Sequence, residues 1–178
     1  MKLFFSFFGL ILFLVFGLSC AKNYPYLEVV KNVDLNRYLG KWYEIARLPN
    51  SFQKDCFCST AEYSILDEET IKVINRCNQD SINGEIDEAE GKAFVVPNTN
   101  NAKLKVQFFW PFKGDYWIID LEEENYSYAV VGHPSREYLW ILARKPKMEE
   151  CEYSALLARI KEKGFDITKI IRNDSGCN

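Results

Sequence analysis

Between residues 42 and 143 the sequence contains eight short segments with the alternating pattern of β-strands. Apolar side chains recur there at every second position, as in strands that face a core on one side. No helical pattern of ten or more residues interrupts them, so neighbouring strands are expected to pair antiparallel. The predicted strands are 42–48, 59–66, 71–75, 86–95, 103–109, 115–121, 126–131 and 138–143. The sequence therefore predicts an all-β fold, an eight-stranded antiparallel up-and-down β-barrel without an open edge.

After the last predicted strand, residues 149–163 change to a helical pattern. Leu156, Leu157 and Ile160 fall on one side, as expected for a helix packed against the barrel from outside. Gly164 is placed to end this helix, because glycine readily adopts the left-handed conformation that follows many helices. Residues 165–167 are predicted as a final extended segment on the barrel wall.

The N-terminus has the pattern of an export signal. A short basic start precedes an apolar run at 3–18, which is shorter than the roughly 20 residues that span a bilayer comfortably. Cleavage before Cys20 with acylation of its thiol is the lipoprotein interpretation, and simple secretion with cleavage near Ser19 or Ala21 is the alternative. The predicted organisation is a signal peptide at 1–19, a tether at 20–32 and one folded domain at 33–178.

Composition excludes several kinds of site. The 22 basic and 25 acidic residues leave a net charge of -3 and form no long block, so no nucleic-acid partner is expected. The single histidine is His133, and Cys56-x-Cys58 has no second pair at zinc spacing, so neither a metal site nor a cofactor is predicted. The aromatic share of 15% is spread over strand-like segments, which suits a cavity walled with rings.

Two of the strand-like stretches have matching ends. The first begins with Gly40-x-Trp42 and the last ends at Arg144. In a closed barrel the Arg144 guanidinium is expected to lie over the Trp42 ring and to plug one end, a cation–π contact that contributes roughly 0.5–2 kcal/mol. Further marks are YLGKWYEIAR at 38–47, AEYS at 61–64, EGKA at 90–93, FFWPF at 108–112 and YLWILAR at 138–144. This pattern resembles the lipocalin family, and within it the bacterial outer-membrane lipoprotein lipocalins and apolipoprotein D.

The resemblance covers nearly all of the chain after residue 30 and supplies the register that places residues inside the barrel. Carried across the sheet, this register gives a mostly aliphatic and aromatic lining around space for about one small ligand. The residues expected to contact a ligand are Ala46, Tyr63, Val73, Asn75, Val106, Phe108, Trp110, Tyr116, Ile118, Tyr138 and Trp140. Also placed inward are Glu44, Leu48, Asp120 and the small residues Ala89, Gly91 and Ala93, which leave space for rings opposite. A packed core without a cavity is the alternative.

The resemblance implies a binding protein without enzymatic activity. Its expected role is binding and storage or transport of a lipid, such as a fatty acid like palmitate or a lysophospholipid, at the cell envelope. The expected location is the outer membrane, anchored through lipid on Cys20 and facing the periplasm, or else secreted or periplasmic and soluble; a homodimer is a further possibility. Two other functions stay open. One is a lipocalin-type enzyme such as an isomerase, and the other is haem binding through His133.

Six cysteines in an exported chain indicate disulfide bonds. The resemblance to apolipoprotein D implies Cys58–Cys177. Pairing of Cys56 with Cys77 is a second expectation, as in several similar bacterial sequences. Strand alternation places these two on opposite faces, so this pairing requires a β-bulge near Cys56. Cys151 is left over, either free on the helix or available for another bond if Cys20 is not acylated.

Overall fold

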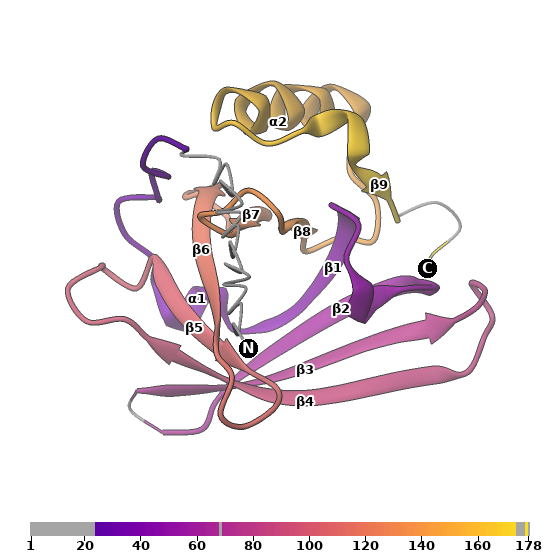
Figure 1. Ribbon diagram of the computed structural model, residues 1–178, viewed down its shortest axis with the longest axis horizontal. Coiled ribbons are helices and arrows are strands. Elements are labelled where there is room, and N and C mark those ends of the chain that lie inside the picture. Colours follow the sequence, from indigo (N-terminus) through magenta and orange to yellow (C-terminus); the bar gives the residue numbers. More distant parts are fainter. Residues whose placement is uncertain (1–23, 68, 174–176, 178) are drawn as a thin grey trace, which may run out of the picture.

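The structure, a computed structural model, describes residues 24–67, 69–173 and 177. The predicted signal peptide and Cys20 lie outside these residues. The described part contains one nine-stranded antiparallel sheet, whose first eight strands close into a barrel because β8 pairs back with β1 (Figure 1). The strands are β1 (Gly40–Arg47), β2 (Cys56–Ile65), β3 (Thr70–Gln79), β4 (Ile86–Val95), β5 (Lys103–Gln107), β6 (Gly114–Leu121), β7 (Tyr128–Gly132), β8 (Leu139–Ala143) and β9 (Ile171–Arg172). The predicted eight-stranded up-and-down barrel is confirmed.

The helices are short apart from the one outside the barrel. They are α1 (Leu35–Tyr38), η1 (Ser51–Gln53), α2 (Glu150–Glu162) and η2 (Ile167–Lys169). The α2 side chains Tyr153, Leu156 and Ile160 pack with outward-facing residues of the barrel, which confirms the predicted external helix. Gly164 follows α2 with φ +88°. The predicted extended segment at 165–167 is wrong in position, since η2 begins at Ile167 and the final strand, β9, follows it and pairs with β1.

One end of the barrel is closed by the predicted plug. The Arg144 guanidinium carbon lies 3.8 Å from the centroid of the Trp42 ring. Arg144 also donates hydrogen bonds to the carbonyl oxygens of Lys41 (2.9 Å) and Arg37 (2.6 Å), while the Trp42 indole N–H donates to the carbonyl of Tyr38 at 2.7 Å. We call this the closed end; it includes α1 and the β2–β3, β4–β5 and β6–β7 links. The opposite end, with the β1–β2, β3–β4, β5–β6 and β7–β8 links, is the mouth.

β-Bulges in β1 and β6 overturn three of the predicted inward positions. In β1 the pairing with β8 shifts by one residue between Glu44 and Ala46, because one strand carries an extra residue there. A shift of one residue exchanges the two faces of a strand. Ala46 and Leu48 therefore pack in the outer cluster with α2, and the prediction that they face inward is wrong.

The same mechanism moves Asp120 on β6. The register with β7 shifts between Ile118 and Asp120, so Ile118 belongs to the interior cluster and Ile119 to the outer one. The carboxylate of Asp120 accepts a hydrogen bond from Arg159 of α2 at 2.7 Å. Asp120 thus lies outside the barrel and ties the helix to it, contrary to the inward position predicted.

A third bulge lies where the cysteines required one. Between Phe57 and Thr60 of β2, two residues stand opposite Cys77 of β3, and Cys58 has φ 51°. The structure contains both expected disulfides, Cys56–Cys77 and Cys58–Cys177. Both cross-links lie toward the mouth, because they involve the first residues of β2 and the last part of β3. Cys151 is free and exposed on α2.

Candidate ligand-binding interior of the barrel

The exposure of inward-facing residues rises from the closed end to the mouth. Ile71, Val73, Leu104 and Ile118 are buried near the closed end. Asn75, Val106, Phe108 and Trp140, nearer the mouth, are only half-buried, and Ala89 at the same level of β4 is exposed. The greater exposure of these inward-facing side chains toward the mouth indicates an interior that opens to solvent there.

Phe108 lies close to the backbone of β4 at Gly91. A Cβ atom at Gly91 would stand 2.7 Å from a carbon of the Phe108 ring, closer than real Cβ atoms come to other atoms. Glycine at position 91 therefore lets this ring occupy the inner wall, as the small residues of the fourth strand led us to expect.

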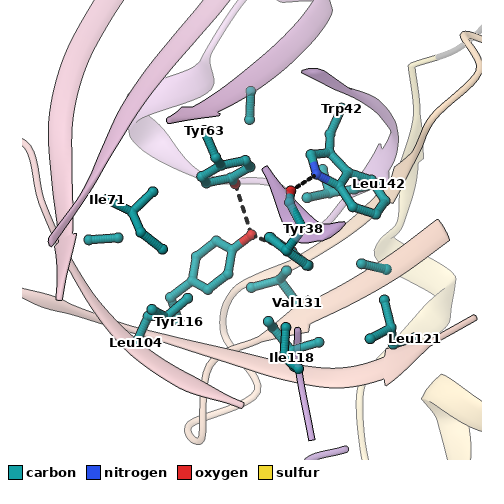
Figure 2. Packing of buried hydrophobic residues seen from close by; sticks show 14 of the residues in the cluster. Tyr38, Trp42, Tyr63, Ile71, Leu104, Tyr116, Ile118, Leu121, Val131 and Leu142 are labelled. Carbon is teal, nitrogen blue, oxygen red and sulfur yellow. Dashed lines mark hydrogen bonds between the residues drawn. The ribbon is translucent and has the colours of Figure 1, made fainter. Parts of the chain in front are cut away.

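Three tyrosines meet inside the closed end. The hydroxyl oxygen of Tyr116 lies 2.8 Å from those of both Tyr38 and Tyr63, and all three rings are buried (Figure 2). Burial raises the pKa of Tyr63 to about 12 and the pKa values of Tyr38 and Tyr116 well above their usual value, so the hydroxyls are neutral. Two hydrogen bonds use two of the three hydroxyl protons, so this cluster can donate one more.

The part played by Tyr38 in this cluster is not predicted from the sequence. Tyr38 comes from α1, ahead of the first strand, where alternation gives no information about which side chains face inward. The only signal in the sequence is the position of Tyr38, two residues before the Gly40-x-Trp42 stretch that carries the plug.

Gln53, which the sequence analysis also missed, holds the β1–β2 link to the wall at the mouth. Its Oε1 accepts from the indole N–H of Trp140 at 2.8 Å, and its Nε2 donates to Glu44 at 2.7 Å. The buried Glu44 carboxylate also accepts from Arg47 (2.5 Å) and Asn173 (3.1 Å). Glu44 therefore has a charged partner and two amide donors, as a buried carboxylate requires.

The predicted ligand contacts divide into three groups. Those that pack in the interior cluster are Tyr63, Val73, Val106, Phe108, Tyr116, Ile118 and Trp140. Asn75 pairs with Ala61 and Ala89 and faces the same way as Val73, and Tyr138 stacks on Trp140 at the rim with ring centroids 6.2 Å apart. Ala46 lies outside, as described above. Trp110 is 86% exposed, because β5 ends at Gln107 and the alternation of the strand does not extend to it.

His133 lies in the β7–β8 link at the mouth, where its ring meets that of Tyr138 edge-on with centroids 5.7 Å apart. Its Nε2 is 3.8 Å from the Asp115 carboxylate, and Asp115 precedes the inward Tyr116. Its Nδ1 is 2.8 Å from the hydroxyl of Ser135, and burial lowers the pKa of the imidazole. The neighbours of the imidazole are thus a carboxylate, a hydroxyl and an aromatic ring at the rim of the mouth. Among residues 24–67, 69–173 and 177, no three His, Cys, Asp or Glu side chains are grouped as metal ligands.

Known proteins share both the sequence and the fold. The Lipocalin-like domain family matches residues 33–175. The outer membrane lipoprotein Blc of Vibrio cholerae is 44% identical over 145 residues, which are 82% of this chain and 84% of that protein. Apolipoprotein D of Bos taurus is 31% identical over 156 residues, covering 84% and 81% of the two chains.

The solved structure of insecticyanin from Manduca sexta superposes with a TM-score of 0.67 at 24% identity, over 85% of each chain, which is a likeness of fold. Within the described part of the chain, no helix combines the length and apolar character needed to cross a membrane. The family match spans most of the chain, the curated relatives exceed 30% identity over most of its length, and the barrel carries the expected plug. The chain therefore belongs to the lipocalin family.

Proposed function

We propose that the barrel binds the acyl chain of a fatty acid or lysophospholipid and stores or carries it at the cell envelope. The observation that carries this proposal is the half-buried apolar wall near the mouth, formed by Val106, Phe108 and Trp140 above a buried floor. Transfer of an alkyl chain onto such a wall contributes about 0.8 kcal/mol per methylene before the cost of ordering the ligand. A chain of fatty-acid length therefore needs no polar recognition to bind.

We infer a binding role rather than catalysis from the chemistry of this wall. Near the mouth its inward groups are aliphatic and aromatic side chains and the amide of Asn75. The tyrosine hydroxyls at the floor are neutral, and the Glu44 carboxylate is occupied by Arg47, Gln53 and Asn173. Acid–base or nucleophilic catalysis needs a group poised to gain or lose a proton at working pH, and these groups do not supply one.

We further propose that lipid on Cys20 holds the protein to a membrane, as the name of the Vibrio cholerae relative, an outer membrane lipoprotein, suggests for that protein. Intact-mass measurement of the N-terminal peptide from membrane-purified protein tests this. The expected peptide begins at Cys20 and carries the mass of the lipid. A mature N-terminus at Ala21 or later contradicts acylation and favours the soluble alternative.

Ligand binding is tested by titration with palmitate and with a lysophospholipid, followed by the fluorescence of Trp140. Val106→Glu places a carboxylate on the wall, where an acyl chain cannot solvate it, and is expected to abolish the saturable response. Gln107→Glu adds the same group one residue away, on the outer face of β5 opposite Lys92, and is the matched control. Trp140→Phe identifies the part of the signal that comes from the wall. Unchanged affinity in a folded Val106→Glu protein would exclude this wall as the binding site.

A further inference from the structure

The β5–β6 link carries the most exposed aromatic rings of the described chain. Phe109, Trp110 and Phe112 are 78%, 86% and 77% exposed, and we call these three residues the aromatic loop. They lie on a turn in which the Phe112 N–H donates to the carbonyl of Phe109 at 2.9 Å. Strand pairing does not account for their exposure, because β5 has ended at Gln107 and β6 begins at Gly114. Exposure of large aromatic rings to water is unfavourable, so a cluster of them indicates a surface that binds an apolar partner.

Other exposed apolar side chains surround the mouth. Phe52 comes from the β1–β2 link, Ile82 from the β3–β4 link and Ile86 from the first residue of β4, and all three are exposed. At the closed end the exposed large apolar side chains are Ile65 and Leu66. The exposed apolar side chains therefore come from several links and surround one end of the barrel. This arrangement suits contact with a flat, deformable apolar surface better than with a single peptide segment that fills a groove.

The first described residues, Tyr24 and Pro25, lie at the same end. Arg136 of the β7–β8 link donates to the carbonyl of Pro25 at 2.7 Å, and its guanidinium carbon lies 5.2 Å from the centroid of the Tyr24 ring. From there the chain runs along the barrel to the closed end, where the Val33 N–H donates to the carbonyl of Asn100 at 3.0 Å. Cys20 is four residues before Tyr24, a span of at most about 14 Å when fully extended. A lipid on Cys20 would thus keep the mouth, rather than the closed end, near the bilayer.

We propose that the aromatic loop inserts into the interfacial region of a lipid bilayer, so that the mouth faces the membrane and an amphiphile passes directly between bilayer and barrel. Tryptophan and phenylalanine favour this region, because it is apolar on one side and hydrated on the other. Lys113 directly follows the loop, with its ammonium 3.8 Å from the centroid of the Phe94 ring. This inference rests on the proposed function, since it gives the route by which a lipid ligand enters.

The test uses the full chain with Cys20→Ser, so that no anchor contributes, and vesicles of phosphatidylcholine. Co-sedimentation is compared with that of a protein that also carries Phe109→Ser, Trp110→Ser and Phe112→Ser. Because the variant lacks three rings that would be buried in the bilayer, its vesicle affinity is expected to be about a hundredfold or more lower. The matched control carries Ile65→Ser and Leu66→Ser at the closed end, and its vesicle affinity is expected to be unchanged. Equal binding by the loop variant and its parent would overturn the proposal.

A second measurement identifies the inserted group. Vesicles with brominated acyl chains are expected to quench Trp110 fluorescence, and Trp110→Phe is expected to keep the binding while losing this quenching. Absence of quenching, or binding that salt abolishes, would show that the rings do not enter the bilayer. If the loop variant instead dissociates a dimer in solution and vesicles have no effect, the loop is an interface between copies of the chain and the proposal is wrong.

Titration with palmitate in the absence of vesicles separates the two proposals. The loop variant is expected to bind palmitate as its parent does, because the exposed rings lie outside the wall. Loss of vesicle binding with palmitate binding intact supports the membrane role of the loop. Vesicle binding that persists in Val106→Glu while palmitate binding is lost supports both proposals. If Val106→Glu keeps both vesicle binding and palmitate binding, only the ligand wall is refuted.

Discussion

The two ends of the barrel are held by different kinds of interaction. The closed end has buried rings, with Arg144 over Trp42 and a hydrogen-bonded tyrosine cluster beneath them. The mouth has half-buried rings on its inner wall and exposed rings on its rim, and both disulfides cross-link the sheet near it. Where the inner wall is only half-buried, packing fixes the strands less firmly, and covalent bonds hold the sheet instead.

Removing the longer cross-link is expected to have the largest effect. Cys58→Ser with Cys177→Ser opens a bond between residues 119 positions apart. On the chain-entropy account, closing a loop of this length stabilises the fold by about 4–5 kcal/mol, because it restricts the unfolded chain. Denaturant unfolding under oxidising conditions measures the loss. Cys151→Ser removes an exposed free thiol and serves as the control. A double variant as stable as the control would mean that the mouth does not depend on this disulfide.

Because of the tyrosine cluster at the closed end, we expect the fold to lose stability at high pH. Burial raises the folded-state pKa of Tyr63 to about 12, above the unfolded value of 10.0, so folding favours the neutral hydroxyl. This contribution is complete below pH 10 and is lost as the pH rises through the folded-state value. Two pKa units correspond to about 3 kcal/mol.

Urea unfolding at several alkaline pH values measures this loss. Tyr63→Phe removes the titrating group and is expected to flatten the fall in stability, whereas phenylalanine at the exposed Tyr26 leaves it unchanged. Equal slopes in Tyr63→Phe and the parent protein would mean that this hydroxyl ionises without cost and that the closed end is wetter than its burial indicates.

Arg144→Ala removes the plug and is expected to cost about 2 kcal/mol, because a cation–π contact and hydrogen bonds to two carbonyl groups are lost together. The midpoint of chemical denaturation measures this cost. Palmitate affinity is expected to stay the same, since the wall lies toward the other end. An unchanged midpoint would contradict the plug as a source of stability, and a large loss of affinity would contradict the separation of the two ends.

The fold was predictable because alternation and short links leave little choice of architecture. The wrongly predicted side-chain directions, as at Ala46 and Asp120, come from β-bulges. An extra residue exchanges the faces of all that follows in the strand, and the residues around it give no local signal of its presence. The bulge at Cys58 was predictable only because a disulfide required it.

The candidate site was predictable where strands are regular and was missed where links fold back over the barrel. Val106 on β5 and Phe108 just after it lie inward, as the register implied by the resemblance places them, but Trp110, two residues further on, is exposed instead. Gln53 comes from η1, and its contact with Trp140 joins residues 87 positions apart. Such a contact depends on the path of a link in three dimensions, which periodicity does not record.

The smallest predicted effect concerns this same contact at the mouth. Gln53→Ala removes the acceptor of the Trp140 indole N–H and one donor to Glu44. Trp140 is half-buried, so water can replace the lost partner, and Glu44 keeps Arg47 and Asn173. The expected loss of stability is therefore only about 0.5–1.5 kcal/mol.

The larger consequence of Gln53→Ala is expected in ligand exchange. The β1–β2 link is released from the wall, and palmitate should dissociate faster while unfolding is nearly unaffected. Stopped-flow displacement followed by Trp140 fluorescence measures the dissociation rate, and Gln107→Ala on the outer face of β5 is the control. If Gln53→Ala destabilises the fold as much as Arg144→Ala while dissociation is unchanged, then the mouth is held as tightly as the closed end. The contrast between a packed floor and an adjustable entrance would then be wrong.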